Sequence, residues 1–467
     1  MALVSLDPRN GVPLVEQIVA SLRHRIEQRG LRPGTRIPPI RRFADDHNIS
    51  RFTVVEAYDR LVAQGYLNAK RGSGFYVAAR SHEAPSQGTC KLERTIDAVW
   101  LVRRMIEDDP AMLKASSAGL PREWLDEAGI RRGLRVLARK NGSHLTEYGS
   151  AQGYLPLRNQ LQFKLSEIGV FAQASQIVLT TGASHALDLI IRYLLKPGDA
   201  VLVDDPGYYV LFGDLKLHGI TLAGVPRNED GPDVAAMEAL IEEHKPKAFF
   251  TQSVAHNPTG SNLSSPVAFR VLQLAEKHGF TIIEDDAYGD LHAGSIHRLA
   301  TLDQLQRVIY VGSFSKTLSS SLRVGFLACR ENMACDLADI KVLSSITTSE
   351  FNERLVYLML TEGHYHKYLD RVRARLAEIR PTTLRSLERC GVGLFCEPKE
   401  GIFLWARVPG HDDSIAIANL AAEAGIVLAP GSVFRPHLEP SPWLRLNVAS
   451  CNHPKLIQFL KRLRSEG

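Results

Sequence analysis

The sequence predicts two folded units in one chain, a small α+β unit of three helices and a hairpin and a large α/β unit. The length of 467 residues exceeds the usual size of one domain. Positive charge is concentrated near the N-terminus, because residues 1–80 carry 13 Lys/Arg against 7 Asp/Glu, a net charge of +6. The remaining residues carry 43 against 44, a net charge of −1. From about residue 96 onward, helical patterns alternate with short apolar runs typical of buried strands.

The composition is that of an ordinary folded protein, with 45% hydrophobic and 23% charged residues. The six cysteines form no C-x-x-C pair and no short disulfide framework, which favours a reducing compartment. The N-terminus lacks the features of a secretory signal, and no apolar run approaches the ~20 residues that span a bilayer. We therefore expect a cytoplasmic protein without membrane contact, internal repeats or a metal site.

Three helices are expected before residue 65. The first runs from Pro13 to about Gln28 with apolar residues at helical spacing, and it ends near Gly30. The second covers Arg41 to about His47. Ser50 is a suitable N-cap for the third helix, which runs from Arg51 to about Gln64.

The third helix is expected to have an exposed first turn and one apolar face. Arg51 and Thr53 lie in that first turn. Residues 66–77 follow as two extended segments around a basic, glycine-rich turn, a pattern that predicts a hairpin. Three helices and a hairpin make a winged helix-turn-helix. The apolar face of the third helix is predicted to contain Val54, Val55, Tyr58, Leu61 and Val62.

The motifs of this unit resemble the winged helix of the GntR family of DNA-binding proteins. The resemblance covers about residues 13–77 and depends on the segments 31–44, 49–54 and 71–74. An arginine at the start of a recognition helix can bind a base edge bidentately, and helix N–H groups attract phosphates. The alternatives are that the positive charge is only a solvated basic face, or that the domain only mediates protein contacts. The resemblance implies DNA contacts from Arg41, Arg51, Thr53, Gly72 and Gly74, the last two at a wing tip near the minor groove.

We place the DNA-binding domain at residues 1–78, a polar linker at residues 79–95 and the large domain at residues 96–467. A mainly parallel sheet is expected in the large domain, with functional residues clustered where its strands end. The expected strands are residues 176–179, 200–203, 248–250, 281–283 and 308–311.

A lysine with the chemistry of a cofactor site follows the last of these strands. Lys316 ends the segment Ser313-Phe314-Ser315-Lys316, and Arg323 comes seven positions later. The segment resembles the Schiff-base loop of fold-type I enzymes, which use pyridoxal 5′-phosphate (PLP). In such a loop the amine attacks the cofactor aldehyde, and hydroxyl groups and a guanidinium hold the phosphate. The resemblance extends from about residue 96 to the C-terminus and implies a class I/II aminotransferase-like fold.

The other parts of such a site occur in the order of that family. Asp285 follows the strand 281–283, where a carboxylate keeps the pyridine nitrogen protonated. Tyr288 and Asn257 match the groups that contact the ring oxygen, and Tyr208 matches the aromatic residue stacked on the ring.

The resemblance also implies which residues contact the phosphate of the cofactor and the carboxylate of the ligand. Tyr148 resembles the tyrosine that reaches the phosphate of a neighbouring subunit, which implies a homodimer with shared sites. Arg445 occupies the position of the arginine that binds the substrate carboxylate, although it could instead form a structural ion pair. The phosphate is expected to contact Ala183, Ser184, Ser313, Ser315 and Arg323.

A GntR-type winged helix joined to a fold-type I domain resembles the MocR/GabR family of bacterial regulators. That resemblance implies a transcriptional regulator that binds promoter DNA at the nucleoid. It would sense PLP or a small amino compound through aldimine exchange at Lys316. Arg445 suggests that such a compound carries a carboxylate as well as an amine. The alternatives are an active PLP-dependent aminotransferase with an appended DNA-binding domain, and a nucleic-acid protein whose large domain is inactive. Slow turnover with specific DNA binding would favour the regulator.

Overall fold

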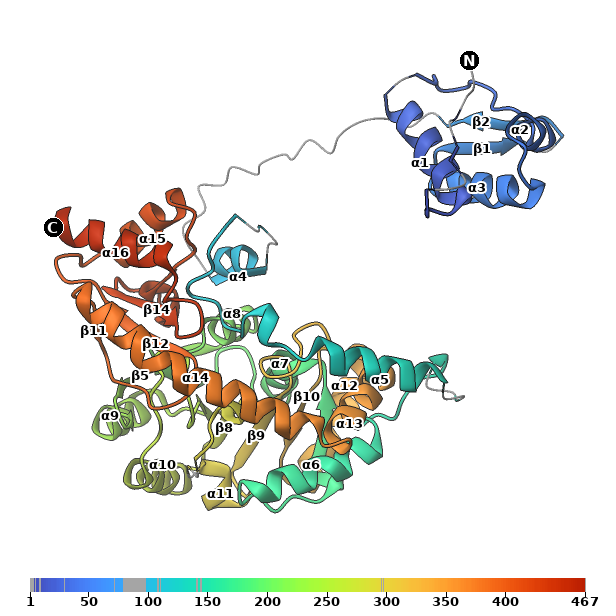
Figure 1. The fold of residues 1–467 in the computed structure, drawn as a ribbon. Coiled ribbons are helices and arrows are strands. Elements are labelled where there is room, and N and C mark those ends of the chain that lie inside the picture. Colours follow the sequence, from blue (N-terminus) through green and yellow to red (C-terminus); the bar gives the residue numbers. More distant parts are fainter. Residues whose placement is uncertain are drawn as a thin grey trace. The chain divides into compact units, whose positions relative to one another are not determined.

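The structure is a computed structural model that divides into two compact units, Met1–Leu92 and Glu93–Gly467 (Figure 1). The predicted linker at residues 79–95 lies outside the described residues. The structure describes residues 10–28, 30–70, 72–78, 98–106, 111–139, 145–294 and 298–466, together with residues 4, 6, 7, 109, 142 and 296.

The small unit contains the three helices and the antiparallel hairpin that the sequence predicts. The hydroxyl of Ser50 accepts a hydrogen bond from the backbone N–H of Phe52 at 3.2 Å and so caps the third helix. The hairpin pairs Leu67 with Val77. The elements are α1 (Leu14–Glu27), α2 (Ile40–His47), α3 (Arg51–Ala63), β1 (Leu67–Lys70) and β2 (Gly74–Val77).

The apolar face of α3 differs from the prediction at two positions. Val55 is 36% exposed, whereas Ala57 is fully buried. Residues 54, 57, 58 and 61 share one helix face because they are three or four positions apart, and Val55 lies outside that stripe. The core of this unit packs that face against Ile18, Leu22 and Phe43.

The large unit is built on an eight-stranded sheet. Strands β9, β8, β7, β4 and β5 are parallel neighbours in that order, and β10 runs antiparallel between β9 and β3. The predicted strands are present, and the sequence patterns missed β5, β6 and β10. In sheet order the strands are β3 (Ile177–Thr180), β10 (Gly325–Ala328), β9 (Val308–Ser313), β8 (Thr281–Asp285), β7 (Ala248–Thr251), β4 (Ala200–Asp205), β5 (Thr221–Asn228) and β6 (Gly231–Pro232).

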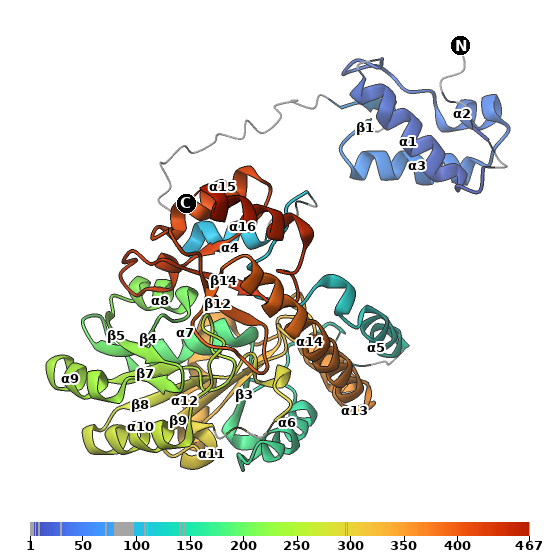
Figure 2. The same cartoon turned by 60° about the vertical axis from the view of Figure 1, so that its left-hand side comes forward.

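Helices cover both faces of this sheet (Figures 1 and 2). Successive strand residues alternate between two apolar clusters: Phe249 and Ile282 face one, Phe250 and Ile283 the other. The second cluster includes α7 (Gly182–Leu194), α8 (Tyr209–Leu217) and α12 (Glu331–Ser345). The first includes α5 (Glu127–Arg139), α6 (Leu155–Glu167), α9 (Val234–His244), α10 (Ser265–His278), α11 (Leu299–Asp303), α13 (Glu350–Thr361) and α14 (His364–Arg389).

A second, four-stranded antiparallel sheet lies in the C-terminal part of the chain, and the sequence patterns did not predict it. Its strand β14 pairs with β12 so that Arg445 lies opposite Trp405. Among the residues that the structure describes, no helix combines the length and apolar composition needed to cross a bilayer. The remaining elements are β11 (Gly393–Leu394), β12 (Phe403–Arg407), β13 (Ala429–Pro430), β14 (Trp443–Asn447), α4 (Ala98–Ile106), α15 (Ser414–Glu423) and α16 (Pro454–Glu466).

Candidate functional site

The residues predicted for a cofactor site gather at one edge of the main sheet. Lys316 follows β9, Asp285 ends β8, Asn257 follows β7 and Tyr208 follows β4. Because these strands are parallel, their carboxyl ends lie side by side, where open α/β sheets bind ligands. A cavity of about 60 Å³ at this edge is lined by Ala183, Ser184, Tyr208, Gln252, Asn257, Asp285, Ala287, Tyr288, Ser313, Ser315, Lys316 and Arg323.

Lys316 is the amine of this cavity. Its Nζ lies 5.8 Å from the centroid of the Tyr288 ring. Burial lowers the pKa of Lys316 to about 8, and the positive charges of Arg445 and Arg323 act in the same direction against the opposing effect of Asp285. A larger fraction of this lysine is therefore neutral near pH 7 than of an exposed lysine, as a nucleophilic amine requires.

Asp285 is a buried carboxylate held by two hydrogen bonds. Its Oδ2 accepts from Gln252 Nε2 at 2.8 Å, and its Oδ1 accepts from the backbone N–H of Ala287 at 3.1 Å. Burial raises the pKa of Asp285 to about 6, although both hydrogen bonds act to lower it. A protonated pyridine ring would supply the positive charge that favours the ionised carboxylate.

Gln252 was not predicted as a site residue. It is buried, and its side-chain oxygen also accepts a hydrogen bond from the backbone N–H of Asn257 at 2.8 Å. One amide thus fixes both Asp285 and the loop that carries Asn257. Its position directly after strand β7 was the signal in the sequence that could have identified it.

Arg445 does not itself line the cavity, but it is bonded to Asn257, which does. Arg445 is fully buried and donates from Nη1 to Asn257 Oδ1 at 2.8 Å and from Nη2 to the backbone oxygen of Ser116 at 2.8 Å. Its guanidinium lies 4.9 Å from the ring centroid of Phe403 and 5.0 Å from that of Phe434. Within the described residues these partners are neutral, and the Nε of Arg445 has no hydrogen-bond partner.

Another part of the cavity, at Arg323 and the N-terminus of α7, can accept a phosphate. Arg323 Nη1 donates to Ser315 Oγ at 3.1 Å, and its Nη2 donates to the backbone oxygen of Thr181 at 3.2 Å. Helix α7 begins here at Gly182, which has φ +75° and whose missing Cβ would lie 2.7 Å from Arg323 Nη2. A glycine therefore keeps open the space between a helix N-terminus and a guanidinium, a combination that binds anions.

Together these observations fit PLP. The cavity combines a buried carboxylate and an amide, Asp285 and Asn257, with an amine, Lys316, and Arg323 lies against Gly182 in an anion cradle. Tyr288 is buried and donates its hydroxyl to the backbone oxygen of Ala118 at 3.1 Å. Ser184 and Arg323 remain exposed, so the phosphate end of the cavity is open in a single chain.

Tyr148 lies outside this cavity and is 77% exposed. The sequence predicts that it reaches the phosphate of a neighbouring subunit. Its exposure leaves the side chain free for such a contact, and the open phosphate end of the cavity would receive it. The subunit-sharing role stays a prediction.

The residues predicted to contact DNA lie on the surface of the small unit. Arg41 and Arg51 are exposed in the first turns of α2 and α3, and Thr53 is partly exposed beside them. Gly72 lies in the hairpin turn and Gly74 begins β2, with φ values of +75° and +103°, which glycine adopts most readily. The sequence analysis did not single out Phe52, whose ring is 85% exposed on the same turn of α3.

Two family profiles match the chain. The profile described as aminotransferase class I and II matches residues 117–463. The profile described as bacterial regulatory proteins of the gntR family matches residues 14–77. These matches confirm the predicted fold class of each domain, and the aminotransferase match confirms that the cofactor class is PLP.

Several known proteins are similar to this chain over most of its length. YdfD of Bacillus subtilis, an HTH-type transcriptional regulator, is 28% identical over 94% of this chain and 93% of its own length. The 2-aminoadipate transaminase of Thermus thermophilus is 31% identical over 73% of this chain and 85% of its own length. The structure of kynurenine aminotransferase from Pyrococcus horikoshii, complexed with PMP, matches with a TM-score of 0.73 at 26% identity, covering 80% of this chain and 95% of that enzyme.

Proposed function

Because the chain belongs to the aminotransferase class I and II family and carries a gntR-family domain, we propose that this transcriptional regulator senses a small amino compound through its PLP domain. The observation that carries the proposal is the buried, uncompensated charge of Arg445 beside Lys316 in a chain that also has a DNA-binding domain. A cation without a counter-ion in the protein favours a ligand that supplies one. The ligand would therefore carry a carboxylate as well as an amine.

Each residue of the cavity has a proposed task. PLP, when bound, supplies an aldehyde that reacts with amines. Lys316 holds the cofactor covalently, Asp285 keeps a proton on the ring nitrogen, and Arg445 binds the carboxylate of the ligand. Phe403 and Phe434 flank the guanidinium and exclude water from that contact.

Sensing requires that the ligand binds two conformations of the protein unequally. Binding of the ligand's amine would leave the Lys316 side chain free, and the ligand's carboxylate would pair with Arg445 in β14. Both changes alter contacts of the large domain, and thereby its balance between states of different DNA affinity. Arg41, Arg51 and Thr53 then read the promoter, with Gly72 and Gly74 in the wing tip.

We further propose that the regulator acts as a homodimer in which Tyr148 completes the phosphate end of the other subunit's cavity. Its 77% exposure and the exposed Arg323 support this assignment. Two DNA-binding domains in one dimer would favour an operator with two half-sites. Binding to the chromosome would place the protein at the nucleoid of a bacterial cytoplasm.

An active aminotransferase with an appended DNA-binding domain is the second candidate function. It is favoured by the complete set of Lys316, Asp285 and Arg445 and by the similarity to 2-aminoadipate transaminase of Thermus thermophilus. Rapid transamination without sequence-specific DNA binding would select this function instead of the regulator.

The proposal is tested by titrating the protein onto its own operator, selected from random duplexes, with PLP and a panel of amines and amino acids. We expect one class of amine to change the operator affinity of the wild type. Lys316→Ala should bind the operator with unchanged affinity and show no response to any amine. Lys247→Ala, which removes an exposed lysine outside the cavity, is the matched control and should respond like wild type. An unaltered amine response in Lys316→Ala would refute the sensing mechanism.

A further inference from the structure

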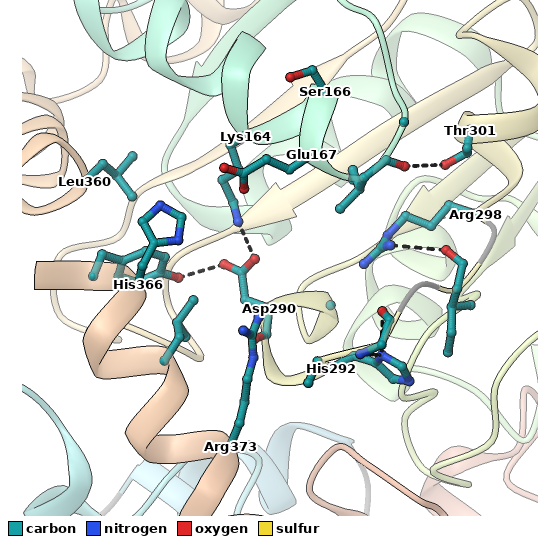
Figure 3. A pocket seen from close by; sticks show the side chains of 18 of the residues that line it. Lys164, Ser166, Glu167, Asp290, His292, Arg298, Thr301, Leu360, His366 and Arg373 are labelled. Carbon is teal, nitrogen blue, oxygen red and sulfur yellow. Dashed lines mark hydrogen bonds and ion pairs between the residues drawn. The ribbon is translucent and has the colours of Figure 1, made fainter. Parts of the chain in front are cut away.

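A second and larger cavity, of about 570 Å³, lies in the large unit on residues that the proposed function does not use (Figure 3). Its wall is formed by α6, by the turn of residues 289–291 that follows β8, and by α14. Lys164 and Arg373 reach Asp290 from two separate segments of the chain, and Arg298 lines another part of the cavity, away from Asp290 (Figure 3). A cavity of this volume can hold a small molecule.

The carboxylate of Asp290 has both oxygens engaged. Lys164 forms an ion pair with Oδ1, and the Tyr365 hydroxyl donates to Oδ2 at 2.7 Å. Burial alone would raise the pKa of Asp290, but Lys164 and Tyr365 outweigh it and the net shift is downward. Asp290 is therefore held as an ionised carboxylate by a cation and a hydroxyl.

The three cationic side chains of the cavity wall still have N–H groups that are free to donate hydrogen bonds. Lys164 uses one of its three N–H groups for Asp290. Arg373 donates from Nε to the backbone oxygen of Asp290 at 3.0 Å and from Nη1 to Asp370 at 3.4 Å. Arg298 donates from Nε to the buried Asp286 at 2.6 Å and from Nη1 to the backbone oxygen of Ile296 at 3.4 Å. Each guanidinium has five N–H groups, so unused donors remain on both. A ligand rich in acceptors, with negative charge, matches this excess of donors.

The wall of the cavity is hydrogen-bonded to the segment that carries the predicted Schiff-base lysine. The hydroxyl of Tyr365, which contacts Asp290, also lies 2.7 Å from Thr317 Oγ1. Thr317 directly follows Lys316 and is fully buried, as Tyr365 nearly is. Two hydrogen bonds, through Tyr365, therefore connect Asp290 with Thr317, the residue after Lys316. Asp290 also lies two residues after Tyr288 in the sequence.

We propose that this cavity is a second binding site, for a small anion with carboxylate or phosphate groups, and that its occupant acts on Lys316 through Asp290, Tyr365 and Thr317. An anion that pairs with Lys164 competes with Asp290 for the ammonium group. The hydrogen bond from the Tyr365 hydroxyl to Asp290 then becomes stronger, and this changes the hydrogen bond between Tyr365 and Thr317. The effect on Lys316 rests on the proposed function, whereas binding of the anion does not.

Binding is tested by isothermal titration calorimetry of the PLP-loaded protein, whose phosphate cradle is already filled. Inorganic phosphate and malonate are the two probes, at constant ionic strength in chloride, and they separate phosphate from carboxylate ligands. We expect wild type to bind at least one probe, Lys164→Met to bind it at least tenfold more weakly, and Lys164→Arg to retain it. Lys247→Met, outside the cavity, should match wild type. No heat with wild type, or equal affinity in Lys164→Met, would overturn the site.

The connection to Lys316 is tested by following the visible absorption band of the lysine-bound cofactor against pH, with and without the anion. The charged groups facing Lys316 are Asp285, Arg323 and Arg445, and those facing Asp290 are Lys164 and Arg373. We expect the anion to shift the midpoint of this pH titration in wild type but not in Tyr365→Phe. Tyr365→Phe should still bind the anion in the calorimeter. An identical midpoint with and without anion in wild type would contradict the connection. Loss of the amine response on the operator would contradict only the proposed function, since the calorimetric result does not depend on it.

Discussion

The two units of this protein present their predicted functional residues in opposite ways. In the small unit, Arg41 and Arg51 are exposed and come from different helices. In the large unit, Arg445 is fully buried and bonded to Asn257, which lies 188 positions earlier in the sequence. Substitutions of separate surface residues tend to add, whereas substitutions within one buried network do not. The comparison therefore predicts local effects in the first unit and distributed effects in the second.

The largest effect is expected from Arg445→Met. This change keeps the volume of the side chain but removes the buried charge, so the affinity for a carboxylate-bearing amine should fall by about 100-fold. Operator affinity in the absence of the amine should stay that of wild type. The measurement is a titration of the cofactor absorption band with the amine that the operator assay identifies. A matched amine without a carboxylate is the control ligand, and it should bind both proteins equally. An equal loss of affinity for both amines would show that the substitution has damaged the cavity as a whole.

A smaller effect is expected from Arg51→Ala in the small unit. Removing one guanidinium from the recognition helix should weaken operator binding by about 30-fold and relax the preference at one base position. The cofactor band and its response to amines should be unchanged. Gel-shift titrations on the selected operator and on its single-base variants measure both parts of this expectation. Arg60→Ala, later on the same helix and paired with Glu56, is the control. An Arg51→Ala protein with altered amine affinity would contradict the separation between the two units.

The sequence predicted best those features that depend on neighbouring residues. Ser50 caps α3 through a hydrogen bond two residues away, and the loop of Lys316 is a continuous motif. Gln252 was missed because its partners Asp285 and Asn257 become its neighbours only when the sheet forms.

The second sheet and the larger cavity were missed for the same reason. The strands of the second sheet are short and pair across long intervals of sequence, as β12 and β14 do. The larger cavity depends on contacts between α6, the turn after β8 and α14, such as that of Lys164 with Asp290. No periodic pattern of apolar residues encodes contacts of this kind.

The smallest expected effect concerns the rate at which PLP attaches to the cofactor-free protein. Only the neutral amine attacks, and with a pKa of about 8 about one-tenth of Lys316 is neutral at pH 7 and about nine-tenths at pH 9. The attachment rate should therefore rise about tenfold over this interval, measured by the growth of the absorption band in stopped flow. Since Arg445 helps to lower the pKa of Lys316, Arg445→Met should move the midpoint to higher pH. Arg51→Ala, in the other unit, is the control and should leave it in place. A midpoint near that of a free lysine in wild type would mean that burial does not tune Lys316.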